Sequence, residues 1–276
     1  MRDDMLIRAT LTGEGLIGLS LLLAAAVLAV AAPLLFPGDP FDIVSRPLLR
    51  PFANPDHLLG TDRLGRDILA MIVHGARPSL LTGLSVAAVA LVAGLTAGAV
   101  AGMFGGMTDE AIMRLADAVQ TVPSFVVALA VVSVLGPSLP GLIAALALSA
   151  WTAPARVVRS EVLRLRGAAF VESSLLLGRS RLAVALTVVL PNALTVALAL
   201  GAVIVASALL SEAALSFLGL GDPNHPSWGA LIAEGRQVMR TAPHVIVAPG
   251  LALFLTVLAV SLVGEGLAKA LSKQPS

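Results

Sequence analysis

The chain has 276 residues, of which 57% are hydrophobic and only 13% are charged, and its formal net charge is +1. A soluble domain carries about 25% charged residues, so this chain has too little polar surface for a water-soluble globule, whereas a bilayer requires no polar cover on its lipid face. The near-neutral charge gives no sign of nucleic-acid binding, and the absence of cysteine excludes disulfides, thiol catalysis and cysteine-based metal sites.

The first apolar segment runs from Leu16 to Phe36 and contains no charged residue. A transmembrane helix needs about 20 apolar residues, because each residue rises about 1.5 Å and the hydrocarbon core is about 30 Å thick. A cleavable signal peptide is the alternative, since Ala29-Val30-Ala31 looks like a cleavage site. The hydrophobic region of a signal peptide is only about 7–15 residues long, however. We therefore predict a transmembrane helix at about residues 16–36.

Five further spans follow along the chain. Pro78–Thr108 is long enough for one long or tilted helix. Ala118–Ala155 is too long for one helix and contains Gly136–Pro140, a sequence of glycine and prolines that breaks helices, so we predict two spans joined by a tight turn. The last two spans are expected at about residues 192–217 and 244–267. The predicted fold is therefore all-α and integral to the membrane, with six transmembrane helices.

Lysine and arginine between the spans set the orientation, because they are enriched on the cytoplasmic side. With the N-terminus inside, the inner side holds eleven basic residues: Arg2, Arg8, Arg114, Arg156, Arg159, Arg164, Arg166, Arg179, Arg181, Lys269 and Lys273. The outer side then holds seven: Arg46, Arg50, Arg63, Arg66, Arg77, Arg236 and Arg240. The six arginines between spans four and five lie close to membrane ends and decide the comparison. Both termini and this loop are predicted to be cytoplasmic.

The cytoplasmic loop between spans four and five has an internal pattern. Ala168–Leu177 is predicted to form a helix, and Gly178 interrupts it, because glycine readily adopts left-handed dihedrals. A second short helix is expected from Ser180 to Leu190-Pro191, where proline turns the chain before span five. Two short helices joined by a glycine elbow suit docking into a groove of a soluble partner. The alternative is an ordinary basic loop whose arginines only set the topology.

The spacing in this loop resembles a known motif. Glu172-Ser173-Ser174 is followed after three residues by Gly178, after nine more by Val188, and after one more by Leu190-Pro191. This resembles the EAA motif of ABC-importer permeases, in which Glu-Ala-Ala, Gly, Ile and Leu-Pro have the same spacing. The departures are serine for both alanines and valine for isoleucine. In that family the motif forms the coupling helix that sits in a groove of the ATPase, so the resemblance assigns ATPase coupling to Glu172, Ser173, Ser174, Gly178, Val188, Leu190 and Pro191.

Three further blocks are similar to signatures of the peptide/nickel subfamily of these permeases. They are His57-Leu58-Leu59-Gly60-Thr61-Asp62 and Gly65-Arg66-Asp67 with Gly75-Ala76-Arg77 and Ser79-Leu80; Gly105–Glu110 with Arg114, Asp117 and Pro123; and Leu215–Gly221 with Pro226-Ser227-Trp228-Gly229, Glu234 and Arg236. Together with the coupling motif they cover most of the chain after residue 57. The resemblance points to the C-type permease of the dipeptide/oligopeptide branch.

This resemblance implies a type I ABC importer transmembrane fold in a bacterial inner membrane. Residues 1–78 would hold the first helix and a long extracytoplasmic loop, and residues 79–276 would form the permease domain with five helices and the coupling segment 168–191. The implied partners are a second, homologous permease, one or two ABC ATPase subunits and an extracytoplasmic solute-binding protein. This chain has no glycine-rich loop followed by lysine. We therefore expect no enzymatic activity and no cofactor in it, with ATP and Mg bound by the partner ATPases.

The implied cargo is short peptides, and nickel chelate, glutathione and haem-type cargo are the alternatives within the subfamily. An ion-coupled secondary transporter would require charged residues near the bilayer midplane and an internal repeat, whereas the middles of spans one, two, four, five and six carry no charge. An intramembrane enzyme would require a Ser/His or paired-Asp arrangement within the spans, and none is found. No metal site is expected, because His57, His74, His225 and His244 lack ligand spacing.

Charged and aromatic residues flank the spans on the predicted outer side. We expect contacts with the binding protein, or a place along the entry, for Asp62, Arg66, Asp67, Arg77, Pro226, Trp228, Glu234 and Arg236. The alternatives are a loop whose charges pair with one another, each exposed pair contributing about 0–1 kcal/mol, and a lid packed on span six. If Gly65–His74 is helical, Arg66 and Asp67 lie near the start of that helix.

Three further charged residues are candidates for a gate or a tether. Arg114 and Asp117 lie three residues apart, which allows an ion pair within one helix. Glu212 lies near the end of span five and is a candidate for facing the translocation path. Pro123 is expected to kink span three.

Overall fold

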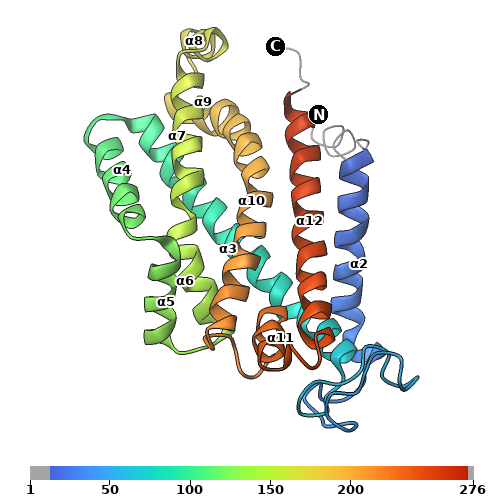
Figure 1. Ribbon diagram of the computed structural model, residues 1–276. Coiled ribbons are helices and arrows are strands. Elements are labelled where there is room, and N and C mark those ends of the chain that lie inside the picture. Colours follow the sequence, from blue (N-terminus) through green and yellow to red (C-terminus); the bar gives the residue numbers. More distant parts are fainter. Residues whose placement is uncertain (1–12, 273–276) are drawn as a thin grey trace.

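All regular elements within residues 13–272, the part of the chain that the computed structural model describes, are helices (Figure 1). This confirms the predicted all-α class. The predicted cytoplasmic residues Arg2, Arg8 and Lys273 lie outside the described residues.

The six predicted spans have counterparts in the structure. Five stretches are each long and apolar enough to cross a bilayer: α2 (Gly13–Leu35), α3 (Ile68–Phe104), α6 (Leu139–Ala150) with α7 (Thr152–Arg166), α10 (Leu190–Phe217) with the turn before it, and α12 (His244–Ser272). A sixth is the pair α4 (Gly106–Thr121) and α5 (Ser124–Leu135), if this bent pair is one span. The shorter elements are α8 (Ala169–Leu176), α9 (Arg181–Val184), the π-helix η1 (Ala185–Val189), α11 (Trp228–Gly235) and the 3₁₀-helix η2 (Arg236–Val238).

Helix α3 begins earlier than predicted. It starts at Ile68 and contains Pro78, where the sequence placed its first residue. Asp67 caps it, because the carboxylate accepts hydrogen bonds from the N–H groups of Leu69 and Ala70 at 2.8 and 3.1 Å. The helix was predicted too short because the prediction used only the uncharged stretch. A helix that extends beyond the bilayer can also include the charged Arg77. The domain division at residue 78 stays a prediction, and that residue falls within α3.

The third span bends at Pro123 through a larger angle than the predicted kink implied. The axes of α4 and α5 differ by 82°. Proline lacks an N–H group and disfavours a helical residue before it, and Val122 is accordingly extended, with φ −94° and ψ 133°. The predicted kink is confirmed, and so is the helix break at Gly136–Pro140, since α5 ends at Leu135 and α6 begins at Leu139.

Small residues hold the spans together. On α3, Gly94, Gly98 and Gly102 face α7, and a Cβ atom at Gly98 would lie 2.3 Å from the carbonyl oxygen of Ala155. In a bilayer, an apolar side chain gains no free energy by packing against another helix instead of against lipid tails. Helices therefore associate through close van der Waals packing, which small residues allow. The α3–α7 pair is therefore a closely packed unit at the centre of the bundle.

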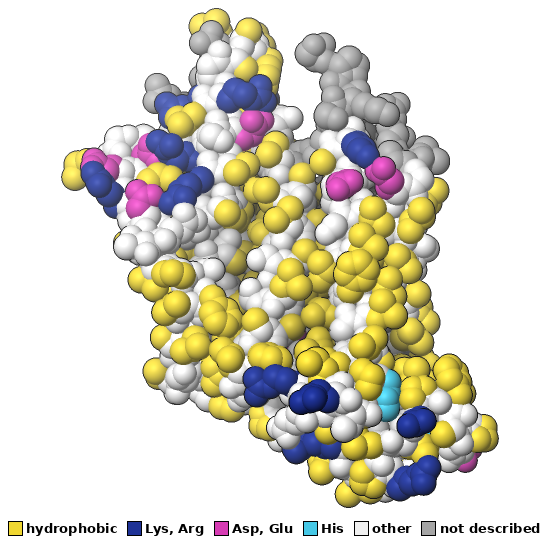
Figure 2. All heavy atoms as spheres, in the orientation of Figure 1, with side chains coloured by type: hydrophobic (Ala, Val, Ile, Leu, Met, Phe, Trp, Pro, Cys, Tyr) yellow, Lys and Arg dark blue, Asp and Glu magenta, His cyan; other side chains and the backbone are white. Residues whose placement is uncertain are grey.

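The two ends of the bundle differ. Helix α8 shares one end with the first described residue of α2 and the C-terminal end of α12, whereas residues 36–67 and α11 lie at the opposite end (Figure 1). Figure 2 shows hydrophobic side chains over the middle of the face it draws, with charged side chains gathered at both ends. This distribution is the one expected of a protein whose middle faces lipid.

Candidate functional site

The loop between spans four and five forms a helical elbow, which we call the elbow segment (residues 168–191). Helix α8 ends at Leu176, Gly178 has φ +84°, and α9 begins at Arg181. A positive φ strongly favours glycine, because a Cβ atom would clash with the backbone. No neighbouring atom lies within 4 Å of where that Cβ would be. The predicted interruption at Gly178 is confirmed, and the backbone alone restricts this position.

Both arms of the elbow segment are anchored to α7. Val171 on α8 and Val184 on α9 are buried in one hydrophobic cluster with Val158, Val162 and Leu165 of α7. Because well-packed side chains transmit displacement rather than absorb it, a movement of α8 would carry α7 with it.

The tip of the elbow segment is apolar and exposed. Leu176 is 88% exposed and Leu177 is 84% exposed, at the end of α8, which lies at the extremity of the bundle (Figure 1). The hydroxyl groups of Ser173 and Ser174 donate to the carbonyl oxygen of Phe170 at 3.1 and 2.8 Å, so both are used within the helix. The sequence analysis did not single out the two leucines, although their place directly before Gly178 was a usable signal. The side chain of Glu172 lies outside the described part of the chain.

The second arm of the elbow segment does not end at Leu190-Pro191, contrary to the prediction. Helices α9, η1 and α10 follow one another with no break from Arg181 to Phe217. The N–H group of Leu190 donates to the carbonyl oxygen of Ala185, five residues earlier. This π-turn loosens the helix where a proline ring would otherwise clash with the preceding turn, and proline is tolerated in the first turn of α10. The elbow segment therefore continues directly into span five.

Two arginines of α7 bind two acidic residues of α4. Arg159 donates to both carboxylate oxygens of Asp109, with Nη2 to Oδ2 at 2.6 Å, and Arg156 donates to Asp117 at 2.7 Å. The predicted pair between Arg114 and Asp117 is wrong, because Asp117 faces α7 and Arg114 lies 3.4 Å from Glu110. These contacts tie the bent helix α4 to the central α3–α7 unit.

Glu212 faces the helix that follows it rather than a path. It is only 2% exposed, and its Oε1 accepts hydrogen bonds from Ser216 and Ser227 at 2.7 and 2.8 Å. Ser227 is also the N-cap of α11. The suggestion that Glu212 lines the path is therefore wrong in this conformation: the residue joins α10 to the start of α11.

Three of the charged residues before span two that were predicted to make outer contacts are buried within the chain. Arg66, 6% exposed, donates from Nε to Asp62 at 2.5 Å and from Nη2 to Glu234. Asp67 caps α3 and also lies 2.7 Å from Nδ1 of His57. Asp62, Arg66 and Asp67 hold the long loop onto α3 and α11, as the alternative of a self-paired loop predicted, so their side chains are not available to a partner.

The same correction applies to the loop before α11. Trp228 is 2% exposed, and its indole N–H donates to the carbonyl oxygen of Ile72 at 3.0 Å, while Pro226 is also buried. Arg77 and Arg236, in contrast, are exposed, and the guanidinium of Arg236 lies 4.8 Å from the ring centre of Phe217. Of the predicted outer contacts, these two arginines present their side chains to the surroundings, and Glu234 does so in part.

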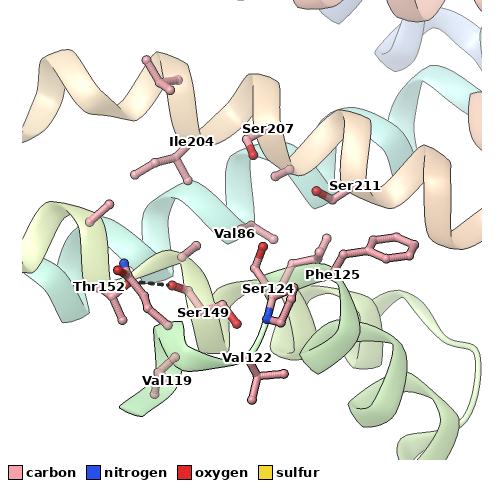
Figure 3. Close-up of a pocket in the computed structure, with 17 residues that line it drawn as sticks. Val86, Val119, Val122, Ser124, Phe125, Ser149, Thr152, Ile204, Ser207 and Ser211 are labelled. Carbon is pink, nitrogen blue, oxygen red and sulfur yellow. Dashed lines mark hydrogen bonds between the residues drawn. The ribbon is translucent and has the colours of Figure 1, made fainter. Parts of the chain in front are cut away.

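A cavity lies at the bend between α4 and α5, and the sequence analysis did not foresee it. Its volume is about 410 Å³, and α3, the α6–α7 junction and α10 complete its walls (Figure 3). Figure 3 shows Ser207 and Ser211 of α10 on one side and Ser124, Ser149 and Thr152 on the other. These residues come from distant parts of the chain, so no local sequence pattern predicted that they would line one cavity.

Comparison with known proteins identifies similar chains. Residues 90–275 match the family described as "Binding-protein-dependent transport system inner membrane component". The chain is 38% identical over 260 residues to a protein of Pseudomonas aeruginosa named "Di/tripeptide transport system permease protein DppC", covering 92% of this chain and 86% of that protein.

Two other relatives differ in their named cargo. The chain is 42% identical over 255 residues to the "Probable peptide ABC transporter permease protein y4tQ" of Sinorhizobium fredii, covering 91% of this chain and 86% of the relative. It is 36% identical over 255 residues to the "Glutathione transport system permease protein GsiD" of Pectobacterium atrosepticum, covering 92% and 84%.

Proposed function

This chain belongs to the family of binding-protein-dependent transport system inner membrane components, and we propose that it is the permease subunit of an ATP-driven importer of short peptides. It is a multi-pass protein of the inner membrane. The elbow segment is the observation that carries the coupling role: a rigidly anchored helix with a bare apolar tip, at the position of the motif that resembles the ATPase-coupling sequence.

The elbow segment supports a mechanical role in three ways. Its tip, Leu176-Leu177, provides an apolar knob for a groove on an ATPase subunit. Its first arm is packed against α7 through Val171, and its second arm continues as α10. ATP binding that draws two ATPases together would move α8, and with it α7 and α10, so that the spans rock between inward- and outward-open arrangements. ATP and Mg would be held by the ATPases.

The remaining partners follow from the same proposal. A second, homologous permease would complete the path, and an extracytoplasmic binding protein would deliver the cargo to the end of the bundle that carries α11. Arg77 and Arg236 are the exposed charges that we assign to that contact. The end that carries α8 is then cytoplasmic, which agrees with the six arginines that lie in and before the elbow segment.

The cargo is proposed from the relatives. The P. aeruginosa and S. fredii proteins are named for peptides and the P. atrosepticum protein for glutathione, which is itself a small peptide-like molecule. The test is ATP-dependent uptake into proteoliposomes that contain this chain, its second permease and its ATPases, with the binding protein added. Uptake of labelled trialanine, with little competition from glutathione, nickel chelate or haem, is expected. Uptake of one of these competitors without uptake of trialanine would contradict the peptide assignment.

A further inference from the structure

Four serine hydroxyls around the cavity at the α4–α5 bend have no hydrogen-bond partner among the described residues. They belong to Ser124 on α5, Ser149 on α6, and Ser207 and Ser211 on α10 (Figure 3). The Oγ atom of Ser149 is also inaccessible to solvent. Ser124 and Ser207 are exposed and Ser211 is partly exposed, so these three present free hydroxyl groups to the cavity. The buried hydroxyl of Ser149 is costly without a partner, which points to a polar group bound beside it.

Other hydroxyls on the same spans behave differently. Those of Thr96, Ser133 and Ser261 each donate to a carbonyl oxygen of their own helix four residues earlier, at 2.7–2.9 Å. That is the usual arrangement for serine and threonine in a transmembrane helix. Ser207 and Ser211 lie well inside α10, where a carbonyl oxygen four residues earlier is within the same helix, yet neither hydroxyl uses it.

The start of α5 adds two further donors to the cavity wall. Residues 122–125 line the cavity, Pro123 has no N–H group, and the N–H groups of Ser124 and Phe125 have no partner among the described residues. Irregular backbone at membrane depth is tolerated only where it is covered by protein or lines a water-filled cavity. The beginning of a helix also carries partial positive charge, which favours a carboxylate.

The position and size of the cavity suit a transported molecule. Val86, which lines it, is the middle residue of α3, and Ser149 and Thr152 flank the junction in the middle of the α6–α7 span. The volume of about 410 Å³ falls within the range of pockets that hold small organic ligands, about 300–1,000 Å³. No Asp, Glu, Lys, Arg or His side chain is among the described residues that line it.

We propose that this cavity is a binding site for the main chain of the peptide in transit, an inference that rests on the proposed function. Hydroxyl groups both donate and accept, so Ser207 and Ser211 can bind the amide groups of any short peptide. The free carboxylate lies at the start of α5, beside Ser124 and Ser149. Because the described residues of the wall include no charged side chain, the cavity binds the main chain that all short peptides share, and selection among peptide side chains takes place elsewhere.

A cysteine placed in the cavity tests for occupancy. The chain contains no cysteine, so Ser207→Cys in the complete complex gives one reporter in this subunit. A charged methanethiosulfonate reagent is expected to label it, because Ser207 is exposed in the cavity wall. Trialanine present during ATP turnover is expected to slow labelling about tenfold, the ratio for a site that is nine-tenths occupied. Trialanine amide, which lacks the carboxylate, protects less. Ser261→Cys, on the outward face of α12, is the matched control and is expected to stay unlabelled. Labelling that trialanine does not slow would overturn the proposal.

A transport measurement provides the second test. The double variant Ser207→Ala/Ser211→Ala is expected to lower the peptide imported per ATP hydrolysed about tenfold, since each lost hydrogen bond changes an equilibrium several-fold. Binding-protein-stimulated ATP hydrolysis is expected to be unchanged, as it is for the control Ser133→Ala. Unaltered uptake in the double variant would refute the cavity site alone, whereas a wild-type complex that does not import trialanine would refute the proposed function itself.

Discussion

Replacing Gly178 tests whether the bend of the elbow segment transmits force. Gly178 has φ +84°, and no atom lies within 4 Å of where its Cβ would be, so a new side chain meets no obstacle and changes only the backbone preference. Left-handed dihedrals cost a residue with a Cβ about 1–2 kcal/mol, and a β-branched residue more. Since 1.4 kcal/mol is a factor of ten, Gly178→Val is expected to reduce the population of the bent form at least about tenfold.

The assay separates coupling from assembly. In reconstituted complexes, Gly178→Val is expected to insert and assemble normally, because the bend lies outside the spans, but to lose most peptide uptake and binding-protein-stimulated ATP hydrolysis. Gly178→Asn is the matched control, because asparagine tolerates left-handed dihedrals, and it is expected to retain most of both activities. Full activity in the valine variant, or equal loss in the asparagine variant, would show that the bend is not what transmits the movement.

Four other variants test neighbouring parts of the structure. Changing both Leu176 and Leu177 to serine is expected to weaken co-purification of the ATPase at least about tenfold, since burying one leucine contributes about 1.5–3 kcal/mol; unchanged co-purification would place the ATPase contact elsewhere. Arg66→Ala leaves the buried Asp62 without its charged partner, a loss of about 3–5 kcal/mol, and is expected to make the long loop sensitive to proteolysis. Arg77→Ala is expected to leave proteolysis unchanged and to lower stimulation by the binding protein. Asp109→Asn removes the bidentate ion pair with Arg159 and is expected to destabilise the solubilised protein by about 1.5–3 kcal/mol in thermal unfolding. An unchanged melting temperature would show that α4 is held by other contacts.

Local features of the chain were predictable from its sequence. Apolar segments of bilayer length predicted the spans, Gly136–Pro140 predicted the turn between α5 and α6, and Gly178 predicted the elbow, because each depends on residues that are neighbours along the chain. Leu190-Pro191 indicated the end of a helix that in fact continues, for a physical reason. A proline usually ends a helix, but a π-turn directly before it lets the helix continue.

Features that depend on distant residues were not predictable in this way. The charge of Arg66 indicated an exposed contact, but its partner Glu234 is 168 residues away, and only the fold shows that Arg66 is buried. The cavity is the same kind of case: its serines lie on three helices, and each alone is an ordinary residue in an apolar helix. Sequence periodicity reports which face of one helix is polar, and it carries no information on which faces meet.

The elbow segment and the cavity are linked by the two helices between them. One arm of the elbow packs on α7, and the other continues into α10. These helices are also opposite walls of the cavity, since Thr152 begins α7 and Ser207 lies on α10. A displacement of α8 that moves α7 and α10 by different amounts must therefore change the separation of those walls. A site that holds peptide by a few neutral hydrogen bonds, each contributing about 0.5–1.5 kcal/mol, releases it when that separation grows, because hydrogen bonds weaken steeply as their geometry is lost. The absence of a charged side chain from the described wall is thus what a transit site needs: a buried ion pair would hold the cargo too tightly to let it leave.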